Sequence, residues 1–497
     1  MRLPLTPLDL LARARRLFPD QTAVVQGDDV RFDYATFAAR CDGLARLLVD
    51  EAGVRPGDRV AFVAGNCHQL LEGYFGVLLA GAVLVPLNIR NAAPELGACL
   101  ADCRATALVR DPTLPDPGFD GPTFGLDDWG SLPAGSAPVD TPAVDEDGPA
   151  ELFYTSGSTG RPKGAVLSHR ALYLHAVHNA LTNGITGDDV LLHTIPLFHV
   201  NGWGTAHFLT GLGGTHVMLP RFDDGEVLRL AERERVTRLF LVPTMVRMIL
   251  DHPDVATRDL SSVRQVSIGG APSTPELLGE VEATLGCEAI CGYGMTESSP
   301  TLTRSLPKPH APSTPEQRAT TGLPILGVDL RVLDDADVEV PWDGAAVGEI
   351  CVRSNHVMTG YWEQPGETEA ALRDGWLRTG DLAVVDPDGY VTIVDRRKDL
   401  IVSGGENIAS VEVEATLLAH PAVREAAVVG MPDDRWGEVP AAFVTLRDGQ
   451  TATEDELIAW VRDRLAHFKA PRRVTILAAL PVGGTGKISK PALRDLL

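Results

Sequence analysis

Two patterns of apolar residues alternate over the first part of the chain. Residues 34–50 and 70–80 repeat apolar side chains at spacings of three and four, which predicts two helices. Short apolar runs at 59–64, 82–87 and 107–109 predict strands between them. Helices and strands that alternate in this way are typical of a parallel sheet covered by helices.

Three further apolar runs each lead into a turn that contains glycine or proline. They cover residues 190–199, 265–268 and 289–291, and each predicts a strand. In open α/β folds the loops that follow such strands meet at one edge of the sheet, where ligands bind. We therefore expect a cleft at that edge.

The pattern changes beyond residue 323. Residues 329–333 and 347–352 alternate polar and apolar side chains, which predicts an antiparallel, barrel-like β region. A charged cluster, Asp395–Asp399, follows and is typical of an interdomain linker. Short strands and two helices, near 410–419 and 454–466, then predict a small α+β domain.

The predicted fold class is therefore α/β plus α+β. A large N-terminal domain of αβ-alternating subdomains and a barrel-like region is expected over residues 1–395, and a small mobile C-terminal domain over residues 400–497, with a hinge at 396–399. A chain of 497 residues is too long for one ordinary core, and 44% apolar residues suit a globular protein.

Charge and apolar runs exclude several classes of function. The 44 basic and 67 acidic residues give a net charge of −23, which opposes binding to nucleic acid or to an anionic membrane. The longest apolar run, 75–87, is shorter than the roughly 20 residues of a membrane span. The first twenty residues lack the apolar core of a secretory signal. We expect a cytoplasmic protein.

Cysteine use points the same way. The seven cysteines include no C-x-x-C pair, which favours a reducing compartment over a disulfide framework. Cys287 and Cys291, like Cys99 and Cys103, are four residues apart but lack nearby histidines that could complete a metal site. These cysteines are predicted to be buried small hydrophobic residues.

The stretch Thr155–Gly164 combines glycines, four hydroxyl side chains and the cations Arg161 and Lys163. Glycine lets the backbone approach a large anion, and hydroxyls and cations add hydrogen bonds and charge, so this loop is predicted to bind a polyphosphate. It is not a Walker A motif, because Pro162 and not glycine precedes Lys163. A flexible surface turn is the alternative interpretation.

Five separated motifs together resemble those of the adenylate-forming enzymes. They are the phosphate loop, Gly292–Glu297, Thr379–Asp381, Arg396–Ile408 and Pro481–Lys487, and they occur in the order and spacing of that superfamily over nearly the whole chain. The superfamily includes acyl-CoA synthetases, aryl-CoA ligases, peptide-synthetase adenylation domains and beetle luciferases. The resemblance implies that a carboxylate attacks the α-phosphate of ATP, giving an acyl-adenylate and pyrophosphate.

The resemblance also implies which residues hold the nucleotide. Thr155 and Glu297 would bind Mg²⁺, a cation that prefers hard oxygen ligands. Asp381 would accept hydrogen bonds from the ribose, with Arg396 supporting the nucleotide. The phosphate loop would contribute Ser156, Gly157, Ser158, Thr159, Gly160 and Lys163, and the adenine slot Gly270, Ala271, Pro272, Gly292, Tyr293, Gly294, Met295 and Thr296.

Further roles follow from the same resemblance. Lys487 would bridge the substrate carboxylate and the α-phosphate, and Lys398 would be the hinge about which the C-terminal domain rotates. His199 would lie near the reacting carboxylate as a fourth catalytic residue beside Lys487, Glu297 and Thr155. The acyl pocket would include His199, Val200, Asn201, Trp203 and Gly204, and the CoA site Ser403, Gly404, Gly405, Trp436, Lys469 and Arg472.

The predicted function is an acid–CoA ligase that uses ATP, Mg²⁺ and coenzyme A. The motif stretches near the acyl pocket contain no arginine or lysine for a second carboxylate, which favours a neutral fatty, aryl or other hydrophobic acid. A stand-alone adenylation enzyme that loads a carrier-protein phosphopantetheine is the alternative, and an inactive nucleotide-binding homologue is a third reading. The sequence leaves open whether the acyl group is transferred to CoA or to a carrier protein, and whether the protein is a homodimer.

Overall fold

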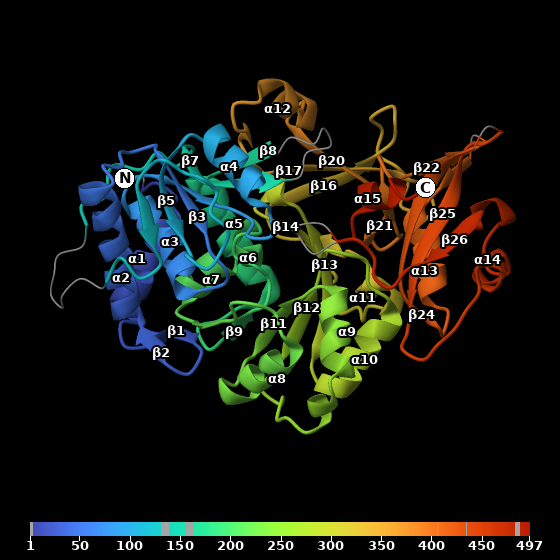
Figure 1. The fold of residues 1–497 in the computed structure, drawn as a ribbon, viewed down its shortest axis with the longest axis horizontal. Helices are drawn as coiled ribbons and strands as arrows, with labels where there is room; N and C mark the ends of the chain where they lie inside the picture. Colours follow the sequence, from blue (N-terminus) through green and yellow to red (C-terminus); the bar gives the residue numbers. More distant parts are fainter. Residues whose placement is uncertain (1–2, 131–138, 156–162, 405, 434, 483–487) are drawn as a thin grey trace. The chain divides into compact units, whose positions relative to one another are not determined.

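The computed structural model describes residues 3–130, 139–155, 163–404, 406–433, 435–482 and 488–497. The chain packs into two compact units (Figure 1). The first comprises Met1–Asp329 and Arg353–Leu377, and the second Leu330–Val352 and Arg378–Leu497. This division describes packing, whereas the predicted boundary at 396–399 concerns movement and stays a prediction.

The first unit contains a sheet of nine strands. Their order across the sheet is β15-β14-β13-β12-β11-β9-β10-β1-β2, and the neighbours from β13 to β1 are parallel. In that order the strands are Leu323–Pro324, Thr301–Arg304, Glu288–Gly294, Gln265–Ile268, Arg238–Leu241, Val190–His193, Thr215–Met218, Thr22–Gln26 and Val30–Asp33. Within the apolar run at 190–199, β9 ends at His193 and the turn at Pro196 follows, in keeping with the predicted strand that leads into a proline turn.

A second sheet in the same unit has seven strands in the order β18-β8-β7-β4-β3-β5-β6. In that order they are Gly360–Tyr361, Lys163–Ser168, Pro149–Thr155, Val83–Pro86, Arg59–Val63, Ala105–Arg110 and Thr123–Gly125. The strands predicted at 59–64, 82–87 and 107–109 are its parallel centre. The sequence reading did not identify β6, which follows the strand predicted at 107–109 along the chain.

Helices cover both faces of the nine-stranded sheet. α8 (Asp224–Arg233), α9 (Pro243–Asp251) and α10 (Pro275–Leu285) bury leucines, valines and isoleucines against β9–β13, and Figure 1 shows them along one side of those strands. On the other face α5 (His169–Asn183) and α7 (Thr205–Leu212) pack against Leu191 and Phe240. The remaining helical segments of the unit are α1 (Pro7–Leu17), α2 (Tyr34–Arg46), η1 (Leu47–Glu51), α3 (His68–Leu79), α4 (Ala93–Asp102), α6 (Val200–Trp203), η2 (Pro253–Ala256), η3 (Thr296–Ser298), α11 (Pro315–Ala319) and α12 (Pro365–Ala371).

Local sequence explains where several of these helices begin. The Thr6 hydroxyl accepts a hydrogen bond from the Leu8 N–H at the start of α1, and Ser168 and Thr274 cap α5 and α10 in the same way. α5 ends at Gly184, whose φ of 60° suits glycine. The sequence reading missed α4.

The second unit contains the larger parts of β16 (Val328–Leu333), β17 (Gly348–Ser354) and β20 (Trp376–Val385), together with β21 (Val391–Arg396). β20 and β21 are antiparallel, as predicted for this region. The short strand β19 (Leu372–Arg373) also pairs with β20.

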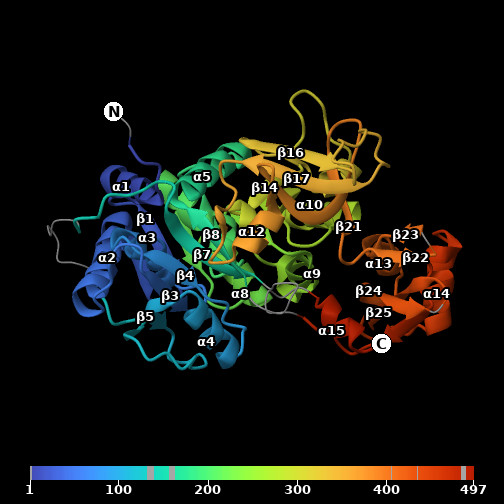
Figure 2. The same cartoon turned by 90° about the horizontal axis from the view of Figure 1, so that it is seen from above.

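The C-terminal part of this unit is a mixed sheet with helices on both faces. α13 (Ser410–Leu418) and α14 (Glu454–Arg462) pack on one face, and α15 (Lys490–Arg494) contributes Leu493 to the other. Figure 2 shows α13 and α14 near this sheet. Its strands are β22 (Ile401–Ser403), β23 (Glu406–Ile408), β24 (Val423–Asp433), β25 (Gly437–Leu446) and β26 (Arg473–Ile476), and a short helix, η4, covers His467–Lys469. The predicted α+β character of this part is confirmed.

Two exclusions made from the sequence can be compared with the structure. All seven cysteines are buried and form no disulfide, which confirms the prediction that they are buried hydrophobic residues. No helix among the described residues has the length and apolar character needed to cross a membrane.

Candidate active site

Parallel strands bring the predicted loops of the first unit to one sheet edge. β9, β11, β12 and β13 are successive parallel neighbours, so the segments that follow them leave from the same edge. These segments contain His199, the exposed Gly270–Pro272 turn and Glu297. The prediction of a shared edge is confirmed, and residues predicted for the acyl and adenine sites follow neighbouring strands there.

The turn that follows β9 has an unusual backbone. Val200, Asn201 and Trp203 have φ angles of 39°, 45° and 64°, in the left-handed region that β-branched and bulky residues rarely adopt. Such strain persists only where surrounding contacts hold it. Asn201 donates a hydrogen bond at 3.1 Å to Glu151, which is fully buried. His207 Nε2 lies 3.0 Å from the other carboxylate oxygen of Glu151.

This buried network joins two parts of the candidate site. Glu151 lies on β7, the strand that ends at Thr155, whereas Asn201 lies in the turn that carries His199. A buried carboxylate is tolerated only when charge and hydrogen bonds compensate it. The turn is therefore attached, through Glu151, to the strand that leads into the phosphate loop.

Two glycines allow Trp203 to lie close to the sheet edge. A Cβ on Gly269 would lie 3.0 Å from Trp203 Cη2 and 3.2 Å from the carbonyl oxygen of Gly292. A Cβ on Gly204 would lie 2.5 Å from Cε1 of His175. The structure therefore brings the predicted acyl-pocket residues Trp203 and Gly204 next to α5 and β12, and brings Trp203 close to the predicted adenine slot.

The phosphate loop lies between β7 and β8, which pair antiparallel. Thr155 at the end of β7 is the register partner of Lys163 at the start of β8, and its hydroxyl donates to the Lys163 carbonyl at 3.4 Å. The Lys163 ammonium forms an ion pair with Glu367 of α12 and lies 5.4 Å from the ring centroid of Tyr361. Ser156, Gly157, Ser158, Thr159 and Gly160 lie outside the described residues.

Glu297 is held by the segment around β18. Its side chain is buried, and the Tyr361 hydroxyl donates a hydrogen bond to Glu297 Oε1 at 2.8 Å. The Met358 N–H donates to the Glu297 carbonyl at 2.8 Å. Burial and the nearby Glu297 carboxylate raise the pKa of Tyr361, so the phenol stays protonated and remains a donor.

β18 also pairs with β8, with Tyr361 opposite Ala165. The segment that fixes the carboxylate of Glu297 is thus hydrogen-bonded to the strand that leaves the phosphate loop. A threonine hydroxyl and a carboxylate are hard oxygen donors of the kind Mg²⁺ prefers, so Thr155 and Glu297 suit this ion chemically. Among the described residues there is no group of three or more His, Cys, Asp or Glu side chains that could hold a metal, and a magnesium ion bound with phosphates needs no such group.

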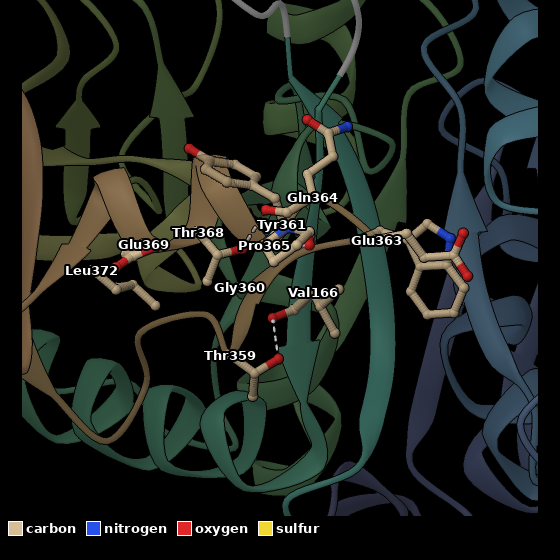
Figure 3. A pocket seen from close by; sticks show the side chains of 11 residues that line it. Val166, Thr359, Gly360, Tyr361, Glu363, Gln364, Pro365, Thr368, Glu369 and Leu372 are labelled. Carbon is tan, nitrogen blue, oxygen red and sulfur yellow. Dashed lines mark hydrogen bonds between the residues drawn. The ribbon is translucent and has the colours of Figure 1, made fainter.

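An open pocket of about 510 Å³ lies beside this corner of the second sheet. Figure 3 shows Tyr361, Thr368 and Val166 around it, with the Thr359 hydroxyl bonded to the Val166 carbonyl. Its lining comes mainly from 359–365 and α12. Tyr361 therefore lies between this pocket and the Glu297 carboxylate.

In the second unit the predicted ribose-binding residues lie side by side. Asp381 on β20 is the register partner of Arg396 on β21, and Arg396 Nε lies 3.2 Å from Asp381 Oδ1. The Gly380 N–H donates to Glu349, which fixes the turn before Asp381. The arrangement places a carboxylate and a guanidinium together, as the resemblance implies.

The predicted CoA residues are only partly grouped. The Gly404 N–H donates to the Trp436 carbonyl at 2.7 Å, and Gly404, with a φ of 61°, packs under the indole. Lys469 donates to both oxygens of Glu412, at 2.9 and 2.7 Å, and the Arg472 N–H donates to the Pro440 carbonyl. Lys469 would have to exchange Glu412 for a phosphate. Ser403 ends β22.

Two predicted positions in this unit have less structural description. Lys398 is exposed between the buried residues Asp395 and Asp399. Gly405 and the catalytic candidate Lys487 lie outside the described residues.

Sequence reasoning missed three residues that the structure places at the candidate site. Glu151 is hidden in an apolar strand, and Tyr361 lies far along the chain from Glu297. Arg304 lies at the end of β14, outside the motif stretches in which cations were sought. Only the fold brings these side chains to the site, and no spacing in the sequence indicates them.

Comparisons with known proteins agree with this geometry. The family model "AMP-binding enzyme" matches residues 11–362, and "AMP-binding enzyme C-terminal domain" matches residues 412–487. A feruloyl-CoA synthase from Amycolatopsis sp is 42% identical, with 97% of each chain covered. A 4-hydroxybutyrate–CoA ligase from Metallosphaera sedula is 35% identical over 99% of this chain and 94% of its own.

Solved structures show the same relationship. ATP-bound MatB from Rhodopseudomonas palustris superposes with a TM-score of 0.89 at 31% identity, covering 99% of both chains. The o-succinylbenzoate CoA synthetase MenE from Bacillus subtilis, in complex with its acyl-adenylate, gives 0.87 at 31% identity, covering 99% of this chain and 98% of that one. The family models and the full-length relatives show that the chain belongs to the AMP-binding enzyme family of the adenylate-forming superfamily.

Proposed function

We propose that this protein is an ATP-dependent acid–CoA ligase that activates a hydrophobic, aryl-type carboxylic acid. The observation that carries the reaction type is full-length similarity to CoA ligases, combined with the Glu297 and Asp381–Arg396 arrangements. The aryl preference rests on the 42% identity to a feruloyl-CoA synthase and on the aromatic pair Trp203 and Phe240, whose centroids lie 6.2 Å apart at 77°.

Two steps make up the reaction. A carboxylate oxygen of the acid attacks the α-phosphorus of ATP, the bond to the β-phosphate oxygen breaks, and pyrophosphate leaves. The thiolate of CoA then attacks the acyl carbonyl, and AMP departs with the electron pair of the broken C–O bond. Both steps concentrate negative charge, so positioned cations and N–H donors are the main catalytic requirement.

Each residue has a proposed part in this scheme. Thr155 and Glu297 hold Mg²⁺, which neutralises charge on the phosphates when bound. Lys163 and the phosphate loop bind the β- and γ-phosphates, and Asp381 with Arg396 fixes the ribose. His199 lies near the reacting carboxylate, and Lys487 neutralises the α-phosphate during the first step. Lys398 is the hinge between the two steps.

The reaction type is tested by measuring pyrophosphate, AMP and thioester together. Fatty, aryl and bulky polycyclic acids are each offered with ATP and Mg²⁺, with and without CoA. CoA-dependent thioester formation in step with AMP supports the proposal. Pyrophosphate release without any thioester would favour a carrier-protein acceptor, and no release with any acid would contradict an active ligase.

Removing one hydroxyl near Glu297 should weaken the metal site. Tyr361→Phe removes the phenol that donates a hydrogen bond to Glu297, so the Glu297 carboxylate is less well oriented. A hydrogen bond to a charged group contributes about 1.5–3 kcal/mol. We expect the Mg²⁺ concentration for half-maximal adenylation to rise by on the order of 10-fold. Magnesium titrations of pyrophosphate release measure this.

Tyr173→Phe is the matched control, because Tyr173 lies on α5 and has no proposed role in the site. It should leave the magnesium curve unchanged. Thermal midpoints separate a general loss of folding from a specific effect on the metal. An unchanged magnesium requirement in Tyr361→Phe would show that this hydroxyl does not support the metal ligand.

A further inference from the structure

Arg304, at the end of β14, is a buried cation that lacks a carboxylate partner among the described residues. It is 3% exposed, and its Nε is buried without a hydrogen-bond partner. Burial lowers the pKa of its guanidinium to about 10, so it still carries a charge at neutral pH. A buried charge is costly unless an ion or hydrogen bonds compensate it. The guanidinium can therefore bind an anion or donate hydrogen bonds to an oxygen acceptor.

A second buried arginine in the same sheet shows the usual arrangement. Arg238 on β11 is 7% exposed, and its Nε lies 3.0 Å from Asp189. Its two other nitrogens donate to Gln265 and to the Gly184 carbonyl at 2.7 and 3.0 Å. All three nitrogens of Arg238 therefore have partners. Arg304 lacks this set of contacts although it is more deeply buried.

The Arg304 guanidinium lies within the proposed acyl site. It is 5.4 Å from the centroid of Phe240, the ring that packs edge-on against Trp203. A Cβ on Gly292 would lie 2.8 Å from Nη1 of Arg304, so glycine at that position leaves room for the guanidinium. The Arg304 guanidinium thus lies between the Phe240 ring and the Gly292 backbone of β13.

Strand register gives the depth of this group. Arg304 is opposite Gly292, two residues before β13 ends at Gly294, and Glu297 follows beyond that end. At ~3.4 Å per residue the Arg304 backbone is ~7 Å inside the edge. In the proposed scheme the metal site and the reacting carboxylate lie at this edge of the sheet. A substrate group that contacts Arg304 is therefore at the end of the acid remote from the reacting carboxylate.

We propose that Arg304 is a specificity residue that binds an oxygen acceptor on the acid, remote from the carboxylate that reacts. The acceptor is a phenol, ether or carbonyl oxygen or a second carboxylate, since all accept hydrogen bonds from a guanidinium. This inference rests on the proposed ligase function and refines its substrate class. It also revises the expectation, drawn from the motif stretches alone, that the acyl pocket contains no cation.

The test compares three acids that differ only at the distal end: cinnamic, 4-hydroxycinnamic and 4-carboxycinnamic acid. Initial rates of CoA-dependent AMP formation give kcat/KM for each. An acid without an acceptor leaves the buried guanidinium unpaired, so the wild-type protein should prefer one or both substituted acids by on the order of 10-fold or more. Arg304→Met should remove this preference, so that the three kcat/KM values become similar within the variant.

Two further variants make the outcome specific. Arg304→Lys keeps the charge but not the planar fork, so a preference for the carboxylate should survive in it and a preference for the phenol should fall. Arg247→Met, which removes a half-buried arginine of α9 paired with Glu280, should leave every ratio unchanged. The ratio of kcat/KM values between two acids, measured on one variant, does not depend on the fraction of that variant that is folded.

The outcomes separate the inference from the function beneath it. If the wild-type protein turns over the three acids with equal kcat/KM, Arg304 does not have the proposed role. The same conclusion follows if Arg304→Met keeps the preference for a substituted acid. Either result leaves the ligase proposal intact. Failure of all three acids, in a preparation that turns over other acids, excludes this aryl class and the inference with it. If no acid supports CoA-dependent AMP formation, the proposed ligase function itself is wrong.

Discussion

Lys487→Ala should slow acyl-adenylate formation by on the order of 10³-fold and leave the second half-reaction almost unchanged, because removing one group that stabilises developing charge typically costs 10²–10³-fold. The carboxylate and the α-phosphate repel each other, and a lysine that bridges them is needed only while their bond forms. During thiolysis this bond breaks, and the proposed rotation about Lys398 has withdrawn the lysine. The residue directly precedes Ile488, which pairs with Val482.

The measurement separates the two half-reactions. Pyrophosphate release from ATP and acid reports the first, and AMP release from a chemically prepared acyl-adenylate with CoA reports the second. Lys490→Ala is a nearby control, because Lys490 is paired with Glu414 and has no proposed role in catalysis. Equal losses of both half-reactions in Lys487→Ala would assign the lysine to folding or general binding.

The hinge variant should give the opposite result. Lys398→Pro restricts the backbone at the proposed pivot, since proline fixes φ near −65°. Adenylation should continue and thioester formation should fall. Intact thioester formation with failed adenylation would contradict the hinge assignment.

Periodicity predicted the parts of the fold in which local and tertiary preferences agree. α1, α5 and α10 begin at hydroxyl caps, a local preference that depends on a few adjacent residues. The predicted strands at 59–64 and 265–268 are almost entirely buried, as expected for the centre of parallel sheets. By contrast, α4 was missed, because its eight small or polar positions give a weaker signal.

The candidate site could be predicted only where its residues cluster in sequence. The motifs with Thr155, Glu297 and Asp381 carry their chemistry within a few positions, so the resemblance located them. Tyr361 is 64 residues from Glu297, and only the pairing of β18 with β8 brings it near. Arg304 looks like an ordinary charged residue in the sequence. Its role depends on burial without a partner, which is a property of the folded chain.

Acidification should destabilise the protein steeply between pH 6.5 and 5, because its core contains neutral histidines. His193 and His216 are 2% and 0% exposed, and Nε2 of His193 lies 2.9 Å from Nδ1 of His216. His216 Nε2 in turn lies 3.0 Å from the hydroxyl of Thr210. This chain of contacts needs uncharged rings, since two adjacent imidazolium ions would repel each other in a dry site.

The sign and size follow from the pKa values. Burial lowers the pKa of His193 to about 3, and burial together with His193 lowers the pKa of His216 well below its usual 6.5. Below pH 6.5 the unfolded chain therefore binds protons that the folded protein does not, and the free energy of unfolding falls as pH falls. At pH 5 His193 alone contributes a loss of about 2 kcal/mol. His175 and His356, whose pKa values burial also lowers, add to it.

Thermal midpoints measured from pH 7.5 to 5 in dilute protein test this expectation. The midpoint should fall steeply below pH 6.5 in the wild-type protein, and less steeply in His216→Gln, which removes one buried titrating group. His310→Gln is the control, because His310 is an exposed histidine that lies outside the buried cluster. A flat profile in the wild-type protein, or equal slopes in the two variants, would show that these buried imidazoles do not govern acid stability. The slope, and not the midpoint at one pH, is the informative quantity, since removing His216 also alters packing at every pH.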